Sequence, residues 1–177
     1  MMTVVTGGSG SGKSEFAENR TLLYSRDHLI YIATMVAFDE EAHRKIARHR
    51  KMRKEKNFDT KECYVDLKAL ELKQEDTVLL DCMSNLVANE MYQEDGAHEH
   101  TVKQIMEAVK AIKEQVRNLV IVTNEVFSDG ITYDEETIRY INYLGAINIA
   151  LAEMSDEVIE VVYTIPIYHK RREGNRC

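Results

Sequence analysis

The sequence contains no tryptophan, one proline and only three cysteines among 177 residues. Cys63, Cys82 and Cys177 are odd in number and lack a Cys-x-x-Cys spacing, so neither a disulfide framework nor a zinc site is expected. No apolar run approaches the roughly 20 residues that a membrane span needs, and the N-terminal stretch does not resemble a signal peptide. We therefore expect a cytoplasmic protein without a membrane span.

Proline-rich linkers, internal repeats and low-complexity segments are also missing. Residues 1–177 are therefore expected to form a single domain. The formal net charge of −7 argues against a nucleic-acid partner. Residues 43–56 nevertheless consist mainly of lysine and arginine, and this local reversal of charge requires a separate explanation.

Short apolar runs alternate along the chain with longer segments of helical period. The apolar runs predict strands at 2–6, 29–34, 77–82, 119–125 and 157–165, with 63–67 as a weaker candidate. The helical spacing predicts helices at 13–25, 39–55, 98–116 and 134–154. This alternation is typical of an α/β fold in which helices cover both faces of a mostly parallel sheet. Ligands of such sheets bind at the carboxyl ends of the strands.

The segment "TGGSGSGKSE" fits the phosphate-loop pattern G-x-x-x-x-G-K-[ST] between a predicted strand and a predicted helix. Glycines let backbone N–H groups converge on an anion, and the helix N-terminus adds further donors. The alternative is a plain Gly/Ser-rich turn. The pattern predicts a P-loop NTPase-like sheet whose phosphate loop is formed by Gly7, Gly8, Ser9, Gly10, Ser11, Gly12, Lys13 and Ser14.

Two of these loop residues have individual expected roles. Lys13 is expected to reach the β- and γ-phosphates, and the Ser14 hydroxyl is expected to ligate Mg²⁺. Asp81 ends the apolar run "TVLLDC" and is the expected second magnesium ligand. A strand-end aspartate without a metal is the alternative for Asp81.

His49 lies within the basic segment, and its cationic neighbours suggest a chemical role. Nearby lysines and arginines disfavour the imidazolium form, which leaves a neutral, nucleophilic ring near pH 7. The same cations could bind a triphosphate and stabilise a leaving pyrophosphate. Nucleotidyl transfer through a phosphoramidate on His49 is one interpretation. A surface histidine on a solvated helix is the other.

Several ordered motifs resemble one family along nearly the whole chain. They are "TGGSGSGKSEFAE", "YIAT", "DEEAHRKIARHRKMR", "TKE", "LLDCMSNLVAN", "VTNEV", "GITYDEETIRYINYLGAINIALAEMSDEV" and "IPIYHK". In this order the motifs resemble the bifunctional adenosylcobinamide kinase / adenosylcobinamide-phosphate guanylyltransferase family of cobalamin biosynthesis.

The resemblance implies two successive reactions on adenosylcobinamide. The first phosphorylates its aminopropanol hydroxyl with ATP or GTP. The second transfers GMP from GTP, through a guanylylated histidine, to adenosylcobinamide phosphate and gives adenosylcobinamide-GDP. The resemblance also implies a homotrimer. It assigns His49 and Lys13 to catalysis, and nucleotide binding to Thr34, Met35, Val36, Arg50, Lys51, Met52, Arg53, Glu62 and Asp81 in addition to the phosphate loop.

The sequence departs from the family pattern on the side expected to face the corrinoid. Phe127 and Thr164 replace glycines, Tyr133 replaces a proline, and Ile149 replaces a glutamine. Two other functions therefore stay open beside the bifunctional enzyme. One is a P-loop kinase of another small metabolite without guanylyltransferase activity, and the other is a nucleotide-binding regulatory subunit without enzymatic activity.

Overall fold

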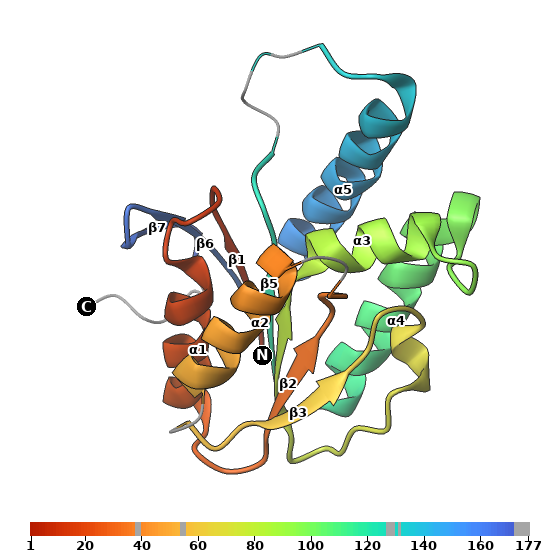
Figure 1. The fold of residues 1–177 in the computed structure, drawn as a ribbon. Helices are drawn as coiled ribbons and strands as arrows, with labels where there is room; N and C mark the ends of the chain where they lie inside the picture. The colour runs from red at the N-terminus through yellow and green to blue at the C-terminus, as the bar shows by residue number, and fades with distance from the viewer. Residues whose placement is uncertain (38–39, 54–55, 127–129, 131, 172–177) are drawn as a thin grey trace.

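In the computed structural model, seven strands form one sheet with helices on both faces (Figure 1). The structure describes residues 1–37, 40–53, 56–126, 130 and 132–171. The strands are β1 Met2–Thr6, β2 Leu29–Ala33, β3 Asp59–Glu62, β4 Thr77–Asp81, β5 Asn118–Val122, β6 Glu157–Val162 and β7 Ile165–Lys170. The helices are α1 Lys13–Tyr24, α2 Glu40–Arg53, α3 Met83–Tyr92, α4 Thr101–Gln115 and α5 Glu135–Met154, with short 3₁₀ turns η1 Leu67–Ala69 and η2 His98–His100.

The sheet has the strand order β3-β2-β4-β5-β1-β6-β7, and every neighbouring pair is parallel except β6 and β7. The central strands β4 and β5 are buried along their whole length, which explains their continuous apolar sequences. The prediction of a mostly parallel P-loop-type sheet with helices on both faces is confirmed. Among the described residues, no helix is both long and apolar enough to cross a membrane.

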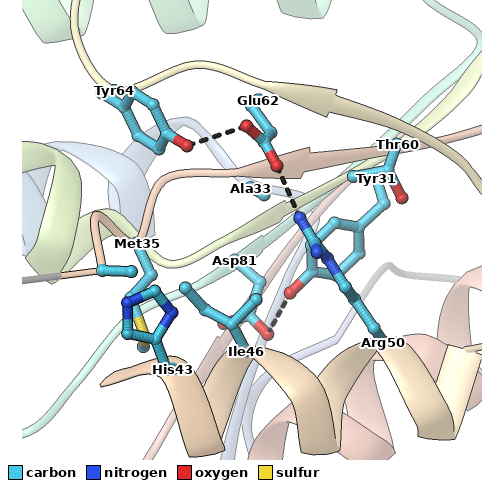
Figure 2. A pocket seen from close by; sticks show the side chains of 11 residues that line it. Tyr31, Ala33, Met35, His43, Ile46, Arg50, Thr60, Glu62, Tyr64 and Asp81 are labelled. Carbon is cyan, nitrogen blue, oxygen red and sulfur yellow. Dashed lines mark hydrogen bonds and ion pairs between the residues drawn. The ribbon is translucent and has the colours of Figure 1, made fainter. Parts of the chain in front are cut away.

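Alternate residues of β1, β2, β4 and β5 enter two separate hydrophobic clusters, one on each face of the sheet. On one face, Val5 and Leu79 pack with Ala17 of α1. On the other, Met2 and Val4 pack with residues of α3, α4 and α5. Helix α2 lies on the α1 side and covers the ends of β2 and β3, and Figure 2 shows the space beneath it. The most exposed strands, β3 and β7, form the two edges of the sheet.

Three parts of the chain differ from the expected elements. Residues 63–67 do not form a strand; the strand is β3, Asp59–Glu62, whose polar side chains give no hydrophobic signal. The expected strand 157–165 ends at Val162, and a turn at Tyr163 and Thr164 leads into β7. Both turn residues have positive φ without being glycine, so the turn has no sequence signal. Helix α3 was not expected.

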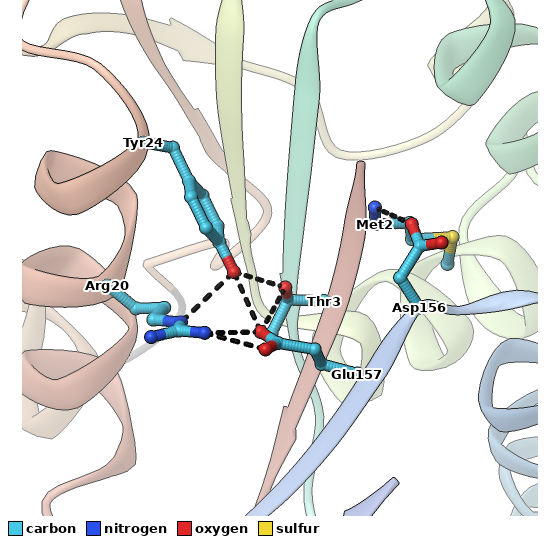
Figure 3. A network of polar contacts seen from close by, with 6 residues as sticks. All are labelled: Met2, Thr3, Arg20, Tyr24, Asp156 and Glu157. Carbon is cyan, nitrogen blue, oxygen red and sulfur yellow. Dashed lines mark hydrogen bonds and ion pairs between the residues drawn. The ribbon is translucent and has the colours of Figure 1, made fainter. Parts of the chain in front are cut away.

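A polar network joins α1 to the amino ends of β1 and β6 (Figure 3). The Arg20 guanidinium donates to both carboxylate oxygens of Glu157, at 2.7 and 2.6 Å. The Tyr24 hydroxyl donates to Glu157 at 2.9 Å, and Thr3 donates to the same carboxylate at 3.3 Å. Because Glu157 is buried, these donors replace the water that its charge would otherwise require. The network lies at the opposite end of the sheet from the phosphate loop and serves the fold.

We expect Arg20→Met to lower the free energy of unfolding by about 3 kcal/mol, because it leaves the Glu157 carboxylate buried without its cation. Urea denaturation measures this loss. The matched control is Arg139→Met, which breaks the exposed Arg139–Glu136 pair at 2.6 Å and should cost less than about 0.5 kcal/mol. Equal small losses in both variants would show that the network contributes no more than a surface ion pair.

Candidate active site

The phosphate loop connects β1 to α1 at the carboxyl edge of the sheet. Gly7, Gly10 and Gly12 have φ angles of 149°, 73° and 90°, which side chains other than hydrogen rarely permit. A Cβ atom on Gly7 would lie 2.5 Å from the carbonyl oxygen of Val161 in β6. The backbone of the loop therefore approaches β6 so closely that position 7 requires glycine.

Hydrogen bonds from two neighbouring segments hold the loop in place. The Glu125 N–H after β5 donates to the Gly7 carbonyl at 3.2 Å. The Thr164 N–H in the β6–β7 turn donates to the Ser11 carbonyl at 2.9 Å. Thr164, which replaces a family glycine, also faces Gly12, where an added Cβ would lie 3.0 Å from its Cγ2. The threonine thus helps to fix the loop.

Lys13 is the buried cation of the loop. Only 8% of the residue is exposed, and its Nζ donates to the Gly8 carbonyl at 3.0 Å. Burial lowers the pKa of Lys13 below its ordinary value, and the nearby Asp81 carboxylate opposes this shift. A triphosphate bound in the loop would supply negative charge in place of the lost hydration and would favour the charged ammonium.

Asp81 ends β4 and comes close enough to Lys13 to influence its charge. The carboxylate is largely buried and accepts a hydrogen bond from the Tyr31 hydroxyl at 2.9 Å. Within the described part of the chain, no cluster of three or more His, Cys, Asp or Glu side chains could hold a metal ion alone. A Ser14 hydroxyl and an Asp81 carboxylate fit Mg²⁺, which takes hard oxygen ligands and fills its remaining positions with water and phosphate oxygens.

Thr34, Met35 and Val36 follow β2 and lie in different surroundings. Thr34 is fully buried, and its hydroxyl donates to the Cys82 carbonyl at 2.8 Å and accepts from the Cys82 N–H at 2.9 Å. Its own carbonyl accepts from the Asn89 amide at 2.8 Å. Thr34 therefore joins the ends of β2 and β4. Met35 lines the cavity described below, whereas Val36 is half-buried beside it.

Helix α2 contributes one described basic contact to this region. Arg50 donates to the Glu62 carboxylate of β3 at 2.8 Å, and the Tyr64 hydroxyl donates to the other Glu62 oxygen at 2.9 Å. Lys51 is exposed. His49 belongs to α2 by its backbone, but the side chains of His49, Met52 and Arg53 lie outside what the structure describes. Their predicted contacts with the nucleotide remain predictions.

A cavity of about 250 Å³ lies between α2 and the ends of β2, β3 and β4 (Figure 2). Three predicted site residues with acidic or basic side chains, Arg50, Glu62 and Asp81, meet there. Sequence analysis missed most of the other lining residues, because β3 was misplaced and single aromatic residues carry no motif. The full lining is Tyr31, Ala33, Met35, Ala37, His43, Ile46, Arg50, Thr60, Glu62, Tyr64 and Asp81.

A second polar group lies where β5 ends, beside α3 and α5. The Asn124 amide donates to the Ser84 hydroxyl at 2.6 Å, and the Thr123 hydroxyl donates to the Asn148 side chain at 2.7 Å. Among the other departures from the family pattern, Ile149 is exposed, Tyr133 is half-buried, and Phe127 lies outside the described residues.

The fold and the glycine loop together place this chain among the P-loop nucleotide-binding proteins. A solved ATPase domain shares the fold with a TM-score of 0.57, at 12% identity over 98% of this chain and 78% of that chain. Within the P-loop class, the family model "cobinamide kinase / cobinamide phosphate guanyltransferase" matches residues 3–168, and the chain belongs to this family.

Curated relatives agree with the family match. The bifunctional adenosylcobalamin biosynthesis protein CobU of Salmonella typhimurium is 31% identical, with 94% of this chain and 98% of that protein aligned. The corresponding CobP protein of Pseudomonas aeruginosa is 28% identical over 94% of this chain and 96% of its own length. The resemblance seen in the sequence is confirmed. The chain is a bifunctional enzyme of adenosylcobalamin biosynthesis, a cobinamide kinase and guanylyltransferase, and the two alternative functions are not favoured.

We expect Gly7→Ala to weaken GTP binding at least tenfold and to lower the free energy of unfolding by roughly 2 kcal/mol. The added methyl group meets the Val161 carbonyl, so the loop must shift. Gly8→Ala is the control for stability, because its Cβ would meet nothing within 4 Å. Calorimetric GTP titration and urea denaturation measure the two effects. An equal loss of stability in both variants would contradict the steric argument.

Proposed function

We propose that the phosphate loop holds the triphosphate of ATP or GTP and that Lys13 contacts its β- and γ-phosphates. The observation that carries this proposal is the burial of Lys13 within the loop, beside the strand-end Asp81. In the kinase step, the hydroxyl oxygen of adenosylcobinamide attacks the γ-phosphorus. The bond to the β–γ bridging oxygen breaks, the hydroxyl proton is lost, and a nucleoside diphosphate leaves.

In the second step, we propose that His49 carries GMP. A neutral imidazole nitrogen attacks the α-phosphorus of GTP, and pyrophosphate leaves. A phosphate oxygen of adenosylcobinamide phosphate then attacks the same phosphorus, the P–N bond breaks, and adenosylcobinamide-GDP forms. Described basic residues of the same helix, such as Arg50 and Lys51, supply positive potential for the departing pyrophosphate.

Mg²⁺ is proposed as the metal cofactor, held by the Ser14 hydroxyl and the Asp81 carboxylate together with phosphate oxygens. When bound, the ion would neutralise charge on the β- and γ-phosphates. The protein's own part is to keep Asp81 oriented, which the hydrogen bond from Tyr31 does. The buried position of Asp81 also limits competing contacts with bulk water.

We propose that the cavity beneath α2 receives the guanine of GTP. Its size suits a purine with part of a ribose. Tyr31 and Tyr64 offer aromatic surfaces, and Glu62 offers carboxylate oxygens that can accept from guanine N1–H and the 2-amino group. An adenine has a ring acceptor at N1 and no 2-amino group, so the same carboxylate would favour GTP.

The assembly and the cellular location are further proposals. We propose a cytoplasmic homotrimer in which each chain forms one domain. Exposed apolar residues on β7, Ile165 and Ile167, and on α5, Ile138 and Ile149, support contacts between copies. The cytoplasm supplies both nucleoside triphosphates.

We expect His49→Ala to abolish protein labelling by GTP that carries ³²P at the α-phosphate. The wild-type label should be acid-labile and base-stable, as a phosphoramidate is. His100→Ala is the matched control and should label like the wild type, since His100 is exposed and lies on the 3₁₀ turn η2. Labelling of His49→Ala at the wild-type level would remove His49 from the mechanism, and an unlabelled wild type would remove guanylyl transfer itself.

We expect Glu62→Gln to raise the KM for GTP in the guanylylation step about tenfold, equivalent to about 1.4 kcal/mol, because a charged acceptor is replaced by a neutral amide. The KM for ATP in the kinase step should change less than twofold. Asp59→Asn provides the control, because Asp59 is an exposed residue of β3 that does not line the cavity. A parallel rise in both KM values would contradict guanine recognition by Glu62.

A further inference from the structure

A largely buried ion pair links the phosphate-loop helix to the segment that follows α2. The Lys56 ammonium lies 2.7 Å from Oε2 of Glu18. The Glu18 side chain is fully buried, and the Lys56 side chain is 20% exposed. Moving the Lys56 ammonium away would leave the buried Glu18 carboxylate without this cation and without water. The pair therefore restricts the position of Lys56 relative to α1.

The two partners come from the two halves of the proposed transferase site. Glu18 follows Ser14 by four residues on α1 and therefore lies on the same helix face, one turn beyond the loop. Lys56 lies three residues after the end of α2 and seven residues after His49. The ion pair thus joins α1, which begins at the phosphate loop, to a residue three positions beyond the helix that carries the histidine.

Neighbouring contacts fix the same segment. Phe58 packs edge-on against Tyr31, with ring centroids 6.2 Å apart. It also joins the hydrophobic cluster that contains Ala17 and Phe16 of α1. Lys56 is therefore anchored on α1 by charge, and Phe58 is anchored on β2 by an aromatic contact.

The contact between α2 and β3 is weaker. Arg50 pairs with Glu62 at 2.8 Å, but the two side chains are 63% and 49% exposed. Exposed ion pairs contribute little to a fixed geometry, because water and salt compete for both partners. The Glu18–Lys56 pair is the more strongly desolvated of the two contacts and the better candidate for setting the position of α2 relative to α1.

We propose that Glu18 and Lys56 are positioning residues for guanylyl transfer. Their ion pair holds the end of α2 against the phosphate-loop helix and so sets the approach of His49 to the α-phosphate of GTP. This proposal rests on the proposed role of His49. The kinase step uses the loop and the γ-phosphate and does not need α2 at that position. Loss of the ion pair should therefore impair guanylyl transfer and spare the kinase step.

The test compares the two half-reactions in Lys56→Met. We expect single-turnover labelling from α-³²P-GTP at saturating nucleotide to slow at least tenfold, since small displacements of a nucleophile cost that much or more. Turnover of adenosylcobinamide with ATP should stay within twofold. Lys56→Arg keeps the cation and should restore labelling to within about threefold of the wild type.

Two further variants separate positioning from stability. Glu18→Gln combined with Lys56→Met removes both charges, so that no buried carboxylate is left without this cation, and should slow labelling as much as Lys56→Met. Lys68→Met is the matched control, because it breaks the exposed Lys68–Glu107 pair at 2.6 Å and should leave both activities unchanged. Thermal unfolding is recorded for every variant.

Each outcome has a defined consequence. Wild-type labelling together with wild-type rates in Lys56→Met overturns the positioning role and leaves His49 in place. A parallel loss of labelling and kinase turnover in both Lys56→Met and the double variant also overturns it, because the pair would then serve the fold alone. Absence of label in the wild type, by contrast, counts against the proposed function.

Discussion

The structure depends on the close approach of the Gly7 backbone to β6. A Cβ atom on Gly7 would lie 2.5 Å from the Val161 carbonyl oxygen, so the loop can adopt this conformation only with glycine at position 7. Hydrogen bonds from Glu125 and Thr164 then fix the loop from the two sides. Within this loop, the buried Lys13 donates to the Gly8 carbonyl at 3.0 Å. The proposed triphosphate site therefore combines this backbone geometry with the buried Lys13 side chain.

Parallel strands bring the remaining polar groups to the same edge. Asp81 is the last residue of β4, and Thr34 and Asn124 follow β2 and β5, so all three lie at the carboxyl ends of the strands. At the amino ends of the strands, Arg20 and Glu157 form a network whose hydrogen bonds need no ligand. The ion pair between Arg20 and Glu157 therefore lies away from the proposed nucleotide site. A triphosphate can bind there without disturbing the contact between α1 and β6.

Sequence reasoning succeeds where local residue types determine the structure. The glycine pattern predicted the phosphate loop, and apolar runs predicted β1 and β4. It failed at β3, where the polar residues Asp59–Glu62 pair in parallel with β2 and show no apolar alternation. It also failed at Tyr163 and Thr164, whose positive φ angles no sequence motif indicates and whose turn contacts the loop through the Thr164 N–H. The cavity and the Glu18–Lys56 pair join residues distant in sequence, so no periodicity or spacing indicates them.

The two proposed reactions place different demands on one bound nucleotide. Phosphoryl transfer needs the γ-phosphate accessible to an alcohol, whereas guanylyl transfer needs the α-phosphate within reach of a nucleophile on α2. In the proposed mechanism one phosphate loop serves both reactions, and the two reactions differ in which phosphorus atom is attacked. Guanylyl transfer therefore requires α2 to be correctly positioned. This helix is highly charged, and Ile46 is its described apolar residue at the cavity. A helix with so little apolar surface gains little from burial and must be positioned by polar contacts. The largely buried Lys56 just beyond the end of α2 supplies such a contact.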